Sequence, residues 1–300
     1  NSNLPVGTIP KTIFILTNQS ASELVGGGYE QILIQNPNPL IALIGTVIIF
    51  LFVAYVESAR IELPLAHGTA RGARGRYPIK LIYASNIPVI LMAALLANIS
   101  MFTMLFYTND ALSGIPLLGG NPLLGVYPAG ENYPTSGLAW YLSTPSGVGD
   151  WLLPILNPDA YGNMVHGHSS LQVIVHVLVY VGVMVGGSVL FAKFWIMTTN
   201  MGPEAVARQI ESSGLQIPGF RRDPRVLKRV LERYIPIVTV ISGAVVGGLA
   251  AGADLIGTVG NASGTGVLLA VGIMIQFYEA LGREQMMEMH PVLRGFFGGE

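Results

Sequence analysis

The stretch LQVIVHVLVYVGVMVGGSVLFA, residues 171–192, contains no charged side chain and is long enough to cross a membrane as a helix. The hydrocarbon core of a bilayer is about 30 Å thick and a helix rises about 1.5 Å per residue, so about 20 apolar residues span it. Four more largely apolar stretches meet this requirement: residues 39–56, 81–107, 234–254 and, after a short outer turn, 255–281. The sequence therefore predicts an all-α, polytopic membrane bundle with five transmembrane helices.

The overall composition agrees with a chain whose main solvent is lipid. Hydrophobic residues make up 51% of the 300 positions and charged residues 11%, and the mean hydropathy is +0.55. These values exclude an ordinary soluble domain. The net charge of −1 offers no general basic field for nucleic acid, and the absence of cysteine excludes disulfides, thiolate nucleophiles and Cys metal sites.

The basic residues predict the orientation of the helices, because short loops rich in Lys and Arg remain in the cytoplasm. Residues 57–80, 193–233 and 282–300 together hold 15 of the 16 Lys and Arg residues. Alternation of the five spans places all three segments on one side of the membrane. We therefore expect two cytoplasmic loops, a cytoplasmic C-terminal tail and an integral protein of the cytoplasmic membrane.

The segments expected on the outer side are residues 1–38 and 108–170. The first contains a single basic residue, Lys11, and the second contains acidic residues but no Lys or Arg. Residues 108–170 are also rich in Gly, Pro and aromatic residues, so we expect an ordered excursion that packs on the outer face.

Three histidines, His166, His168 and His176, lie close together near the start of residues 171–192. A catalytic zinc site would need a spacing such as His-Glu-x-x-His, which the sequence does not contain. Hydrogen-bonded or interfacial histidines are the simpler interpretation. We therefore expect no enzyme, no cofactor and no metal site, and an intramembrane hydrolase built on these histidines is the competing hypothesis.

Polar residues interrupt the span 81–107. Pro88 is expected to break its hydrogen-bond ladder and kink the helix, and Asn86 and Asn98 must face protein or water. Twelve residues separate the two asparagines, so they need not share one face of a helix. They indicate either interhelical hydrogen bonds or a helix that lines an aqueous path, as in one half of a secondary transporter or ion channel for small solutes.

Small residues recur every four positions in the span 234–254, which predicts close packing against another helix. The two rows are Gly243, Gly247 and Ala251, and Gly248 and Gly252. Acidic and basic residues are missing from the interior of every span, although Asp254 borders one. Ion-coupled transporters usually need such a group near the midplane, so its absence disfavours that function.

The first cytoplasmic loop carries Arg71, Arg74 and Arg76 in a glycine-rich setting. Positive-inside topology and attraction to anionic lipid, about 1 kcal/mol per basic group, explain these arginines without a partner. A flexible loop that projects arginines also suits a phosphate-rich partner.

Several stretches in order resemble the archaeal-type SecY/Sec61 alpha family of protein translocation channels. The three most specific are VESARIELPLAHG at 56–68, RYPIK at 76–80 and NIPVIL at 86–91. Four more follow along the chain: GLAWYLSTP at 137–145, PGFR at 218–221, RYIP at 233–236 and GTGVLL at 264–269. The resemblance extends from about Pro39 to the tail and is poor in residues 1–38.

This resemblance implies that the five spans are the family's helices six to ten, one half of a ten-helix clamshell channel. The N-terminal half would then be missing or lie on another chain. Two positions match the ring of aliphatic side chains at the narrowest point of the pore, Ile90 and Leu269. Asn98 matches a polar position of the lateral gate, to which we assign Asn86 and Pro88 of the same segment.

The resemblance also implies partners. Arg71 and Arg221 fall where the family contacts the ribosome or another motor, and their neighbours Arg74, Arg76 and Arg222 lack equally firm counterparts. A SecE/Sec61 gamma-like subunit would clasp the two halves, and a small SecG/Sec61 beta-like subunit would lie beside them. The implied function is to pass unfolded secretory polypeptides across the membrane, bind their signal sequences, and release transmembrane segments through the lateral gate into the bilayer.

Overall fold

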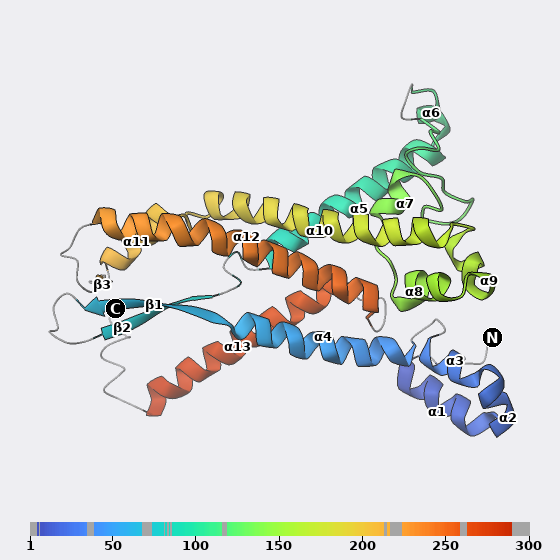
Figure 1. Ribbon diagram of the computed structural model, residues 1–300, viewed down its shortest axis with the longest axis horizontal. Coiled ribbons are helices and arrows are strands. Elements are labelled where there is room, and N and C mark those ends of the chain that lie inside the picture. The colour runs from blue at the N-terminus through green and yellow to red at the C-terminus, as the bar shows by residue number, and fades with distance from the viewer. Residues whose placement is uncertain are drawn as a thin grey trace.

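The structure is a computed structural model of residues 1–300 (Figure 1). It describes residues 5, 7–34, 39–67, 74–80, 82, 84, 86–115, 119–212, 215–216, 224–258 and 263–289, and of residues 61–80 only the backbone is considered.

Within the described residues, five helices are long and apolar enough to cross a membrane, as the sequence predicts. They are α4 (Leu40–Ser58), α5 (Ile87–Thr108), α10 (Ser170–Thr198), α12 (Pro224–Ile256) and α13 (Gly264–Met289). Helices α10 and α12 lie side by side along most of their length. In the view of Figure 1, α4 and α13 lie below this pair and cross each other. The prediction of a helical membrane bundle with five spans is confirmed.

The helix ends differ from the ends of the apolar stretches. Helix α5 begins at Ile87, not at residue 81, so Pro88 lies in the first turn. A proline there removes no intrahelical hydrogen bond, because the first N–H groups of a helix have no partner within it. The expected kink at Pro88 is therefore wrong, and Pro88 instead helps to start the helix.

Helix α12 begins ten residues before the expected span and extends well beyond its apolar part. Its first turns pack against α11 (Pro203–Ser212), an amphipathic helix whose buried residues Val206, Ala207 and Ile210 share a small core with Leu227 and Leu231 of α12. The segment expected as a cytoplasmic loop, residues 193–233, thus contributes most of a second core, which Ala84, Ala192 and Ile235 complete.

The first basic segment, residues 57–80, forms a β-hairpin. Strand β1 (Arg60–His67) pairs antiparallel with β2 (Arg74–Lys80) and with the short β3 (Leu215–Gln216), in the order β2-β1-β3. Apolar residues alternate along β1 at Ile61, Leu63 and Leu65, which is the period of a strand. This small sheet adds to the helical bundle at one of its ends.

The remaining elements gather at the opposite end of the bundle (Figure 1). Before α4 these are α1 (Thr8–Asn18), α2 (Ala21–Glu23), η1 (Leu24–Gly28) and α3 (Tyr29–Leu33). Between α5 and α10 they are α6 (Asp110–Ser113), α7 (Leu138–Leu142), α8 (Val148–Leu156), α9 (Pro158–Tyr161) and η2 (Gly162–Val165).

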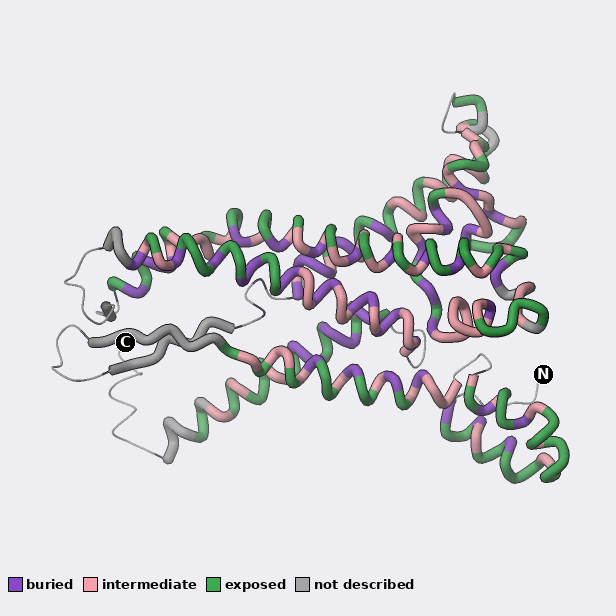
Figure 2. Tube along the Cα trace, in the orientation of Figure 1, coloured by how far each residue is buried: buried purple, intermediate pink, exposed green. Residues whose placement is uncertain are grey.

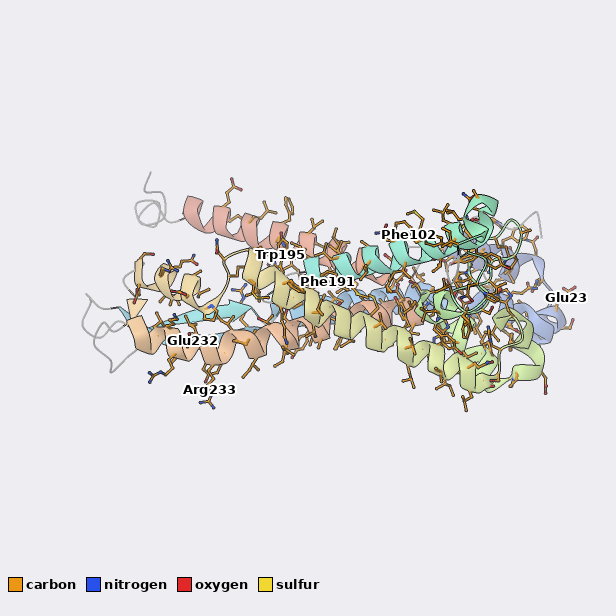
Figure 3. All side chains as sticks on the ribbon, turned by 90° about the horizontal axis from the view of Figure 1, so that it is seen from above. Glu23, Phe102, Phe191, Trp195, Glu232 and Arg233 are labelled. Carbon is orange, nitrogen blue, oxygen red and sulfur yellow. The ribbon has the colours of Figure 1, made fainter. Side chains whose placement is uncertain are left out.

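The two ends therefore separate the segments that the sequence assigns to opposite sides of the membrane. Glu232 and Arg233 lie toward one end and Glu23 lies at the other (Figure 3). The basic residue expected on the outer side, Lys11, is 3% exposed. Its burial in α1 lowers the pKa of its ammonium group below the ordinary value, because desolvation disfavours the charged form.

The main core lies where the five long helices face one another, and exposed residues follow their outward faces (Figure 2). Along the pair α10 and α12, a Cβ atom on Gly247 would lie 2.8 Å from the carbonyl oxygen of Met184, and one on Gly243 would lie 2.8 Å from the Cα of Val189. Those distances are too short for any larger residue, so the predicted close packing of this row is confirmed. The second row makes no such approach, since a Cβ on Gly252 would meet nothing within 4 Å.

Candidate functional site

The predicted ring residue Ile90 lies in the first turn of α5. Its side chain is half-buried and packs against the main core. Its backbone N–H donates to the carbonyl of Asn86 at 3.3 Å, so the position of Ile90 depends directly on how Asn86 is held.

The other predicted ring residue, Leu269, lies in the second turn of α13. Leu268 and Val271 are fully buried, whereas Leu269 is 39% exposed. Because successive residues of a helix are about 100° apart, Leu269 lies beside the buried stripe, on a face that this chain leaves uncovered. An unfilled side of the bundle is what one half of a channel requires, and the role of both residues as a pore ring stays a prediction.

A buried polar contact joins the starts of α5 and α13 to the end of α4. The Asn86 side chain is 9% exposed, and its Nδ2 donates to Oε1 of Glu57 at 2.8 Å and to the carbonyl of Leu268 at 3.2 Å. A Cβ atom on Gly272 would lie 2.6 Å from that Nδ2. Asn86 is therefore an interhelical link, one of the two alternatives that its sequence position left open.

Asn98 has a different environment. Its side chain is exposed, and its Nδ2 donates to the carbonyl of Ala94 in the same helix at 2.8 Å. Twelve residues of helix correspond to about 18 Å along the axis, so the structure does not bring Asn98 to Asn86. Of the three residues assigned to the gate, Asn98 is the one that faces away from the chain's own core.

Of the five arginines assigned to contact a ribosome or motor, two lie within the described residues. Arg71, Arg221 and Arg222 lie outside the described residues. Arg74 and Arg76 lie in β2, where their backbones pair with Ala66 and Pro64 of β1. The hairpin holds the segment that carries these arginines at the end of the bundle where β3 and α11 also lie (Figure 1).

Two of the three histidines that could have formed a hydrolase site, His168 and His176, have structural partners. His168 stacks on Trp140 with ring centroids 3.9 Å apart, and its Nε2 bonds the carbonyl of Thr135 at 2.8 Å. Nε2 of His176 bonds the carbonyl of Ser143 at 3.0 Å. In the described part of the chain, no group of three His, Cys, Asp or Glu residues could hold a metal ion.

These histidine contacts fasten residues 135–143 to the start of α10. Trp140 lies against both His168 and His176, and its helix α7 packs on α10. Residues 135–143 are thus held against α10, and His168 and His176 serve as the attachment points.

A buried carboxylate in the last turn of α12, Asp254, has a role that sequence reasoning missed. Oδ2 of Asp254 accepts from the hydroxyl of Tyr180 at 2.6 Å, and Oδ1 accepts from the backbone N–H of Gly264 at 2.6 Å. Trp151 adds a bond from Nε1 to the carbonyl of Leu255 at 2.9 Å. Asp254 therefore caps α13 and ties it to α10. The available signal was an acidic residue at the end of an apolar stretch, followed by a turn rich in small residues.

The sequence also matches the model of a known protein family. The family model named SecY matches residues 6–278, which is most of the chain. The chain belongs to the SecY family. The match begins at residue 6, so it includes most of the outer segment that the motif resemblance left unassigned.

Curated SecY proteins from archaea are similar over nearly the whole chain. The chain is 45% identical over 278 residues to protein translocase subunit SecY of Halobacterium salinarum, which covers 92% of this chain and 52% of that protein. It is 42% identical over 301 residues to the SecY of Archaeoglobus fulgidus, covering 100% and 58%. The chain thus spans about half the length of the SecY relatives it matches.

Solved SecY structures share its fold. One, described in work on how the SecY plug domain stabilises the closed channel, aligns with a TM-score of 0.64 at 38% identity, covering 94% of this chain and 61% of that one. A second, described as a protein conducting channel, also has a TM-score of 0.64, at 37% identity, and covers 94% and 58%.

Proposed function

We propose that this chain forms the C-terminal half of a SecY protein-conducting channel, which passes unfolded secretory polypeptides across the membrane. The observation that carries the proposal is the SecY family match over residues 6–278, on a bundle with five membrane-spanning helices. A channel of this kind makes and breaks no covalent bond, so the proposal includes no enzymatic step, cofactor or metal.

The proposed pore ring consists of Ile90 and Leu269 together with residues of the other half of the channel. Aliphatic side chains form a constriction that disfavours water and ions and can deform around a passing polypeptide. The exposure of Leu269 beside a fully buried stripe supports this assignment.

The proposed lateral gate includes Asn98 with Asn86 and Pro88 on α5. A seam that opens needs modest contacts to the opposite half. Asn98 suits such a seam because its side chain is exposed and its Nδ2 already donates to the carbonyl of Ala94 within its own helix, a bond that persists when the seam parts.

The proposed cytoplasmic partner is a ribosome or another motor, contacted by Arg71, Arg74, Arg76, Arg221 and Arg222. Basic side chains on loops suit a phosphate-rich surface. A structure with the same fold, at a TM-score of 0.56 and 20% identity, is described as the yeast Ssh1 complex bound to the 80S ribosome.

The remaining proposed partners complete the channel: its N-terminal half, a SecE/Sec61 gamma-like subunit, a small beta subunit, signal-bearing nascent chains and the surrounding lipid. The charge distribution supports a location in the cytoplasmic membrane with a cytoplasmic C-terminus.

The competing hypothesis of a small-solute transporter or ion channel has lost one of its two supports. It rested on the half-bundle architecture and on a kinked second span lining an aqueous path, and Pro88 lies in the first turn of α5, where it requires no kink. The polar residue beside it, Asn86, is engaged by α4 and α13.

The proposed function is tested by replacing Ile90 and Leu269 with Asn, separately, in the complete channel complex. We expect greater ion leak through the resting channel and export of substrates with weakened signal sequences. The matched control is Leu178→Asn, because Leu178 is exposed on α10, a helix that carries neither proposed ring residue. Unchanged conductance in both ring variants, with normal assembly, would contradict the proposal.

A further inference from the structure

The contact between Asn86, Glu57 and α13 lies next to both proposed ring residues. Asn86 precedes Ile90 by four positions and accepts the Ile90 N–H with its backbone carbonyl. Its side chain donates to the carbonyl of Leu268, the residue immediately before Leu269. One residue thus links the two positions that would have to align at the narrowest point of the pore.

The geometry points to Asn86 as a positioning residue that sets the rotation and height of α13 relative to α5, and so aligns Leu269 with Ile90. We name Asn86, Glu57 and Gly272 together the α13 clamp. This inference rests on the proposed function, since it concerns the same pore ring.

The hydrogen bonds of the clamp fix the orientation of the amide. Nδ2 carries two hydrogens and faces two acceptors, the Glu57 carboxylate and the Leu268 carbonyl. The reversed amide would point an oxygen at both acceptors and is unfavourable. Oδ1 of Asn86 is buried and has no hydrogen-bond partner within the described residues, and the two bonds from Nδ2 offset the cost of that unsatisfied oxygen.

Gly272 supplies the space that the clamp needs. A Cβ atom at this position would lie 2.6 Å from Nδ2 of Asn86 and 3.0 Å from Oε1 of Glu57. Any larger residue must therefore push α13 away or displace the amide.

A second contact holds the same face of α13. The guanidinium of Arg60, just beyond the end of α4, lies 2.7 Å from Oε1 of Glu279. Leu268, Gly272 and Glu279 are four and seven residues apart, so they share one face of the helix. Both anchors act on the face next to Leu269, and a rotation of α13 by one residue, about 100°, would move Leu269 off the pore.

The test uses Gly272→Ala and Asn86→Asp in the complete channel complex. Asp at position 86 keeps the shape of Asn but removes at least one of the two donors that face Glu57 and the Leu268 carbonyl, since a carboxyl carries at most one O–H. Loss of a hydrogen bond to a charged group corresponds to about a tenfold shift between the held and released positions of α13. We expect ion leak to rise by about that factor in both variants while the complex still assembles.

Two controls separate this role from general damage. Gly282→Ala changes the same helix at a position where a Cβ meets nothing within 4 Å, and Asn109→Asp makes the same substitution at the far end of α5, where the retained oxygen still accepts the Ala111 N–H. We expect both controls to conduct like the wild type.

A double substitution adds a readout that a merely structural role would not give. Asn86→Ala removes the nearer of the two groups that a Cβ at position 272 would strike, and leaves only the end of the Glu57 side chain at 3.0 Å. Adding Gly272→Ala to Asn86→Ala should therefore raise the leak far less than Gly272→Ala does alone. Additive effects of the two changes would overturn the clamp.

A distance measurement makes the result independent of transport. The chain contains no cysteine, so spin labels can be attached at two introduced cysteines, Phe102→Cys on α5 and Phe277→Cys on α13, both exposed positions. We expect a second distance population in the Gly272→Ala and Asn86→Asp variants and one population in the controls.

The outcomes distinguish failure of the clamp from failure of the proposed channel function. Leak from the Ile90→Asn and Leu269→Asn variants but not from the clamp variants would overturn the clamp and leave the proposed function standing. Unchanged ion conductance in both ring variants would contradict the proposed function and with it the role of the clamp at the pore. An unchanged distance distribution in both clamp variants would overturn the clamp whatever the conductance.

Discussion

Replacing Gly247 with Ala tests the seam between α10 and α12, the most extensive contact in the bundle. The new Cβ would lie 2.8 Å from the carbonyl oxygen of Met184 and 2.9 Å from the Cβ of Ser188. Overpacking of this kind costs about 1–3 kcal/mol, whereas Ala in place of Gly within a helix gains about 1 kcal/mol from intrinsic propensity. The two effects oppose each other, so the single variant alone does not isolate the clash.

Gly252→Ala provides the matched reference, because it lies in the same helix and its Cβ would meet nothing within 4 Å. It receives the propensity gain without the clash. The difference in unfolding free energy between the two variants should therefore equal the overpacking cost, about 1–3 kcal/mol. Thermal unfolding of the purified complex in detergent measures it, with Gly247→Ala melting at the lower temperature. Equal melting temperatures would refute the close packing of this seam.

Three other contacts give direct predictions. Tyr180→Phe removes the hydroxyl bonded to Asp254 and should lower the unfolding free energy by about 1.5–3 kcal/mol, as for other hydrogen bonds to charged groups; an unchanged midpoint in denaturant would contradict the bond. His168→Ala removes the ring stacked on Trp140 and should speed proteolysis of residues 135–143 and shift the emission of Trp140 to the red. Equal cleavage rates would show that this segment is held by other contacts. Arg60→Ala breaks a partly exposed ion pair with Glu279 of α13 and should lower the unfolding free energy by less than about 1 kcal/mol. A larger loss that added salt does not reduce would contradict this prediction.

The membrane part of the fold could be predicted from the sequence because its cause is local. Each span needs only a sufficient run of apolar residues, and the Gly243 and Gly247 row needs only a period of four. Pro88 shows the limit of that reasoning. A proline has the same appearance in the sequence whether it lies in the middle of a helix or in its first turn, and here the helix starts one residue before it.

The polar contacts could not be predicted because their partners are distant along the chain. Glu57 and Leu268 meet Asn86 across 29 and 182 residues, and Tyr180 meets Asp254 across 74. The sequence marked Asn86 as a residue that must face protein or water, and only the packing of α4, α5 and α13 shows which. The strands were overlooked for another reason, since the alternation in β1 is short and lies next to a longer apolar span.

Site-specific photocross-linking tests the central claim most directly, that this chain is one wall of a channel with an aliphatic constriction. A photoreactive amino acid is introduced at position 90 or 269 of the complete channel, and at Leu178 or Phe194 on the exposed face of α10, while a secretory polypeptide is stalled in transit. The account predicts adducts to the stalled polypeptide from positions 90 and 269 and little from the two α10 positions. Adducts from α10 alone, or none from positions 90 and 269 in a channel that is still exporting, would contradict it.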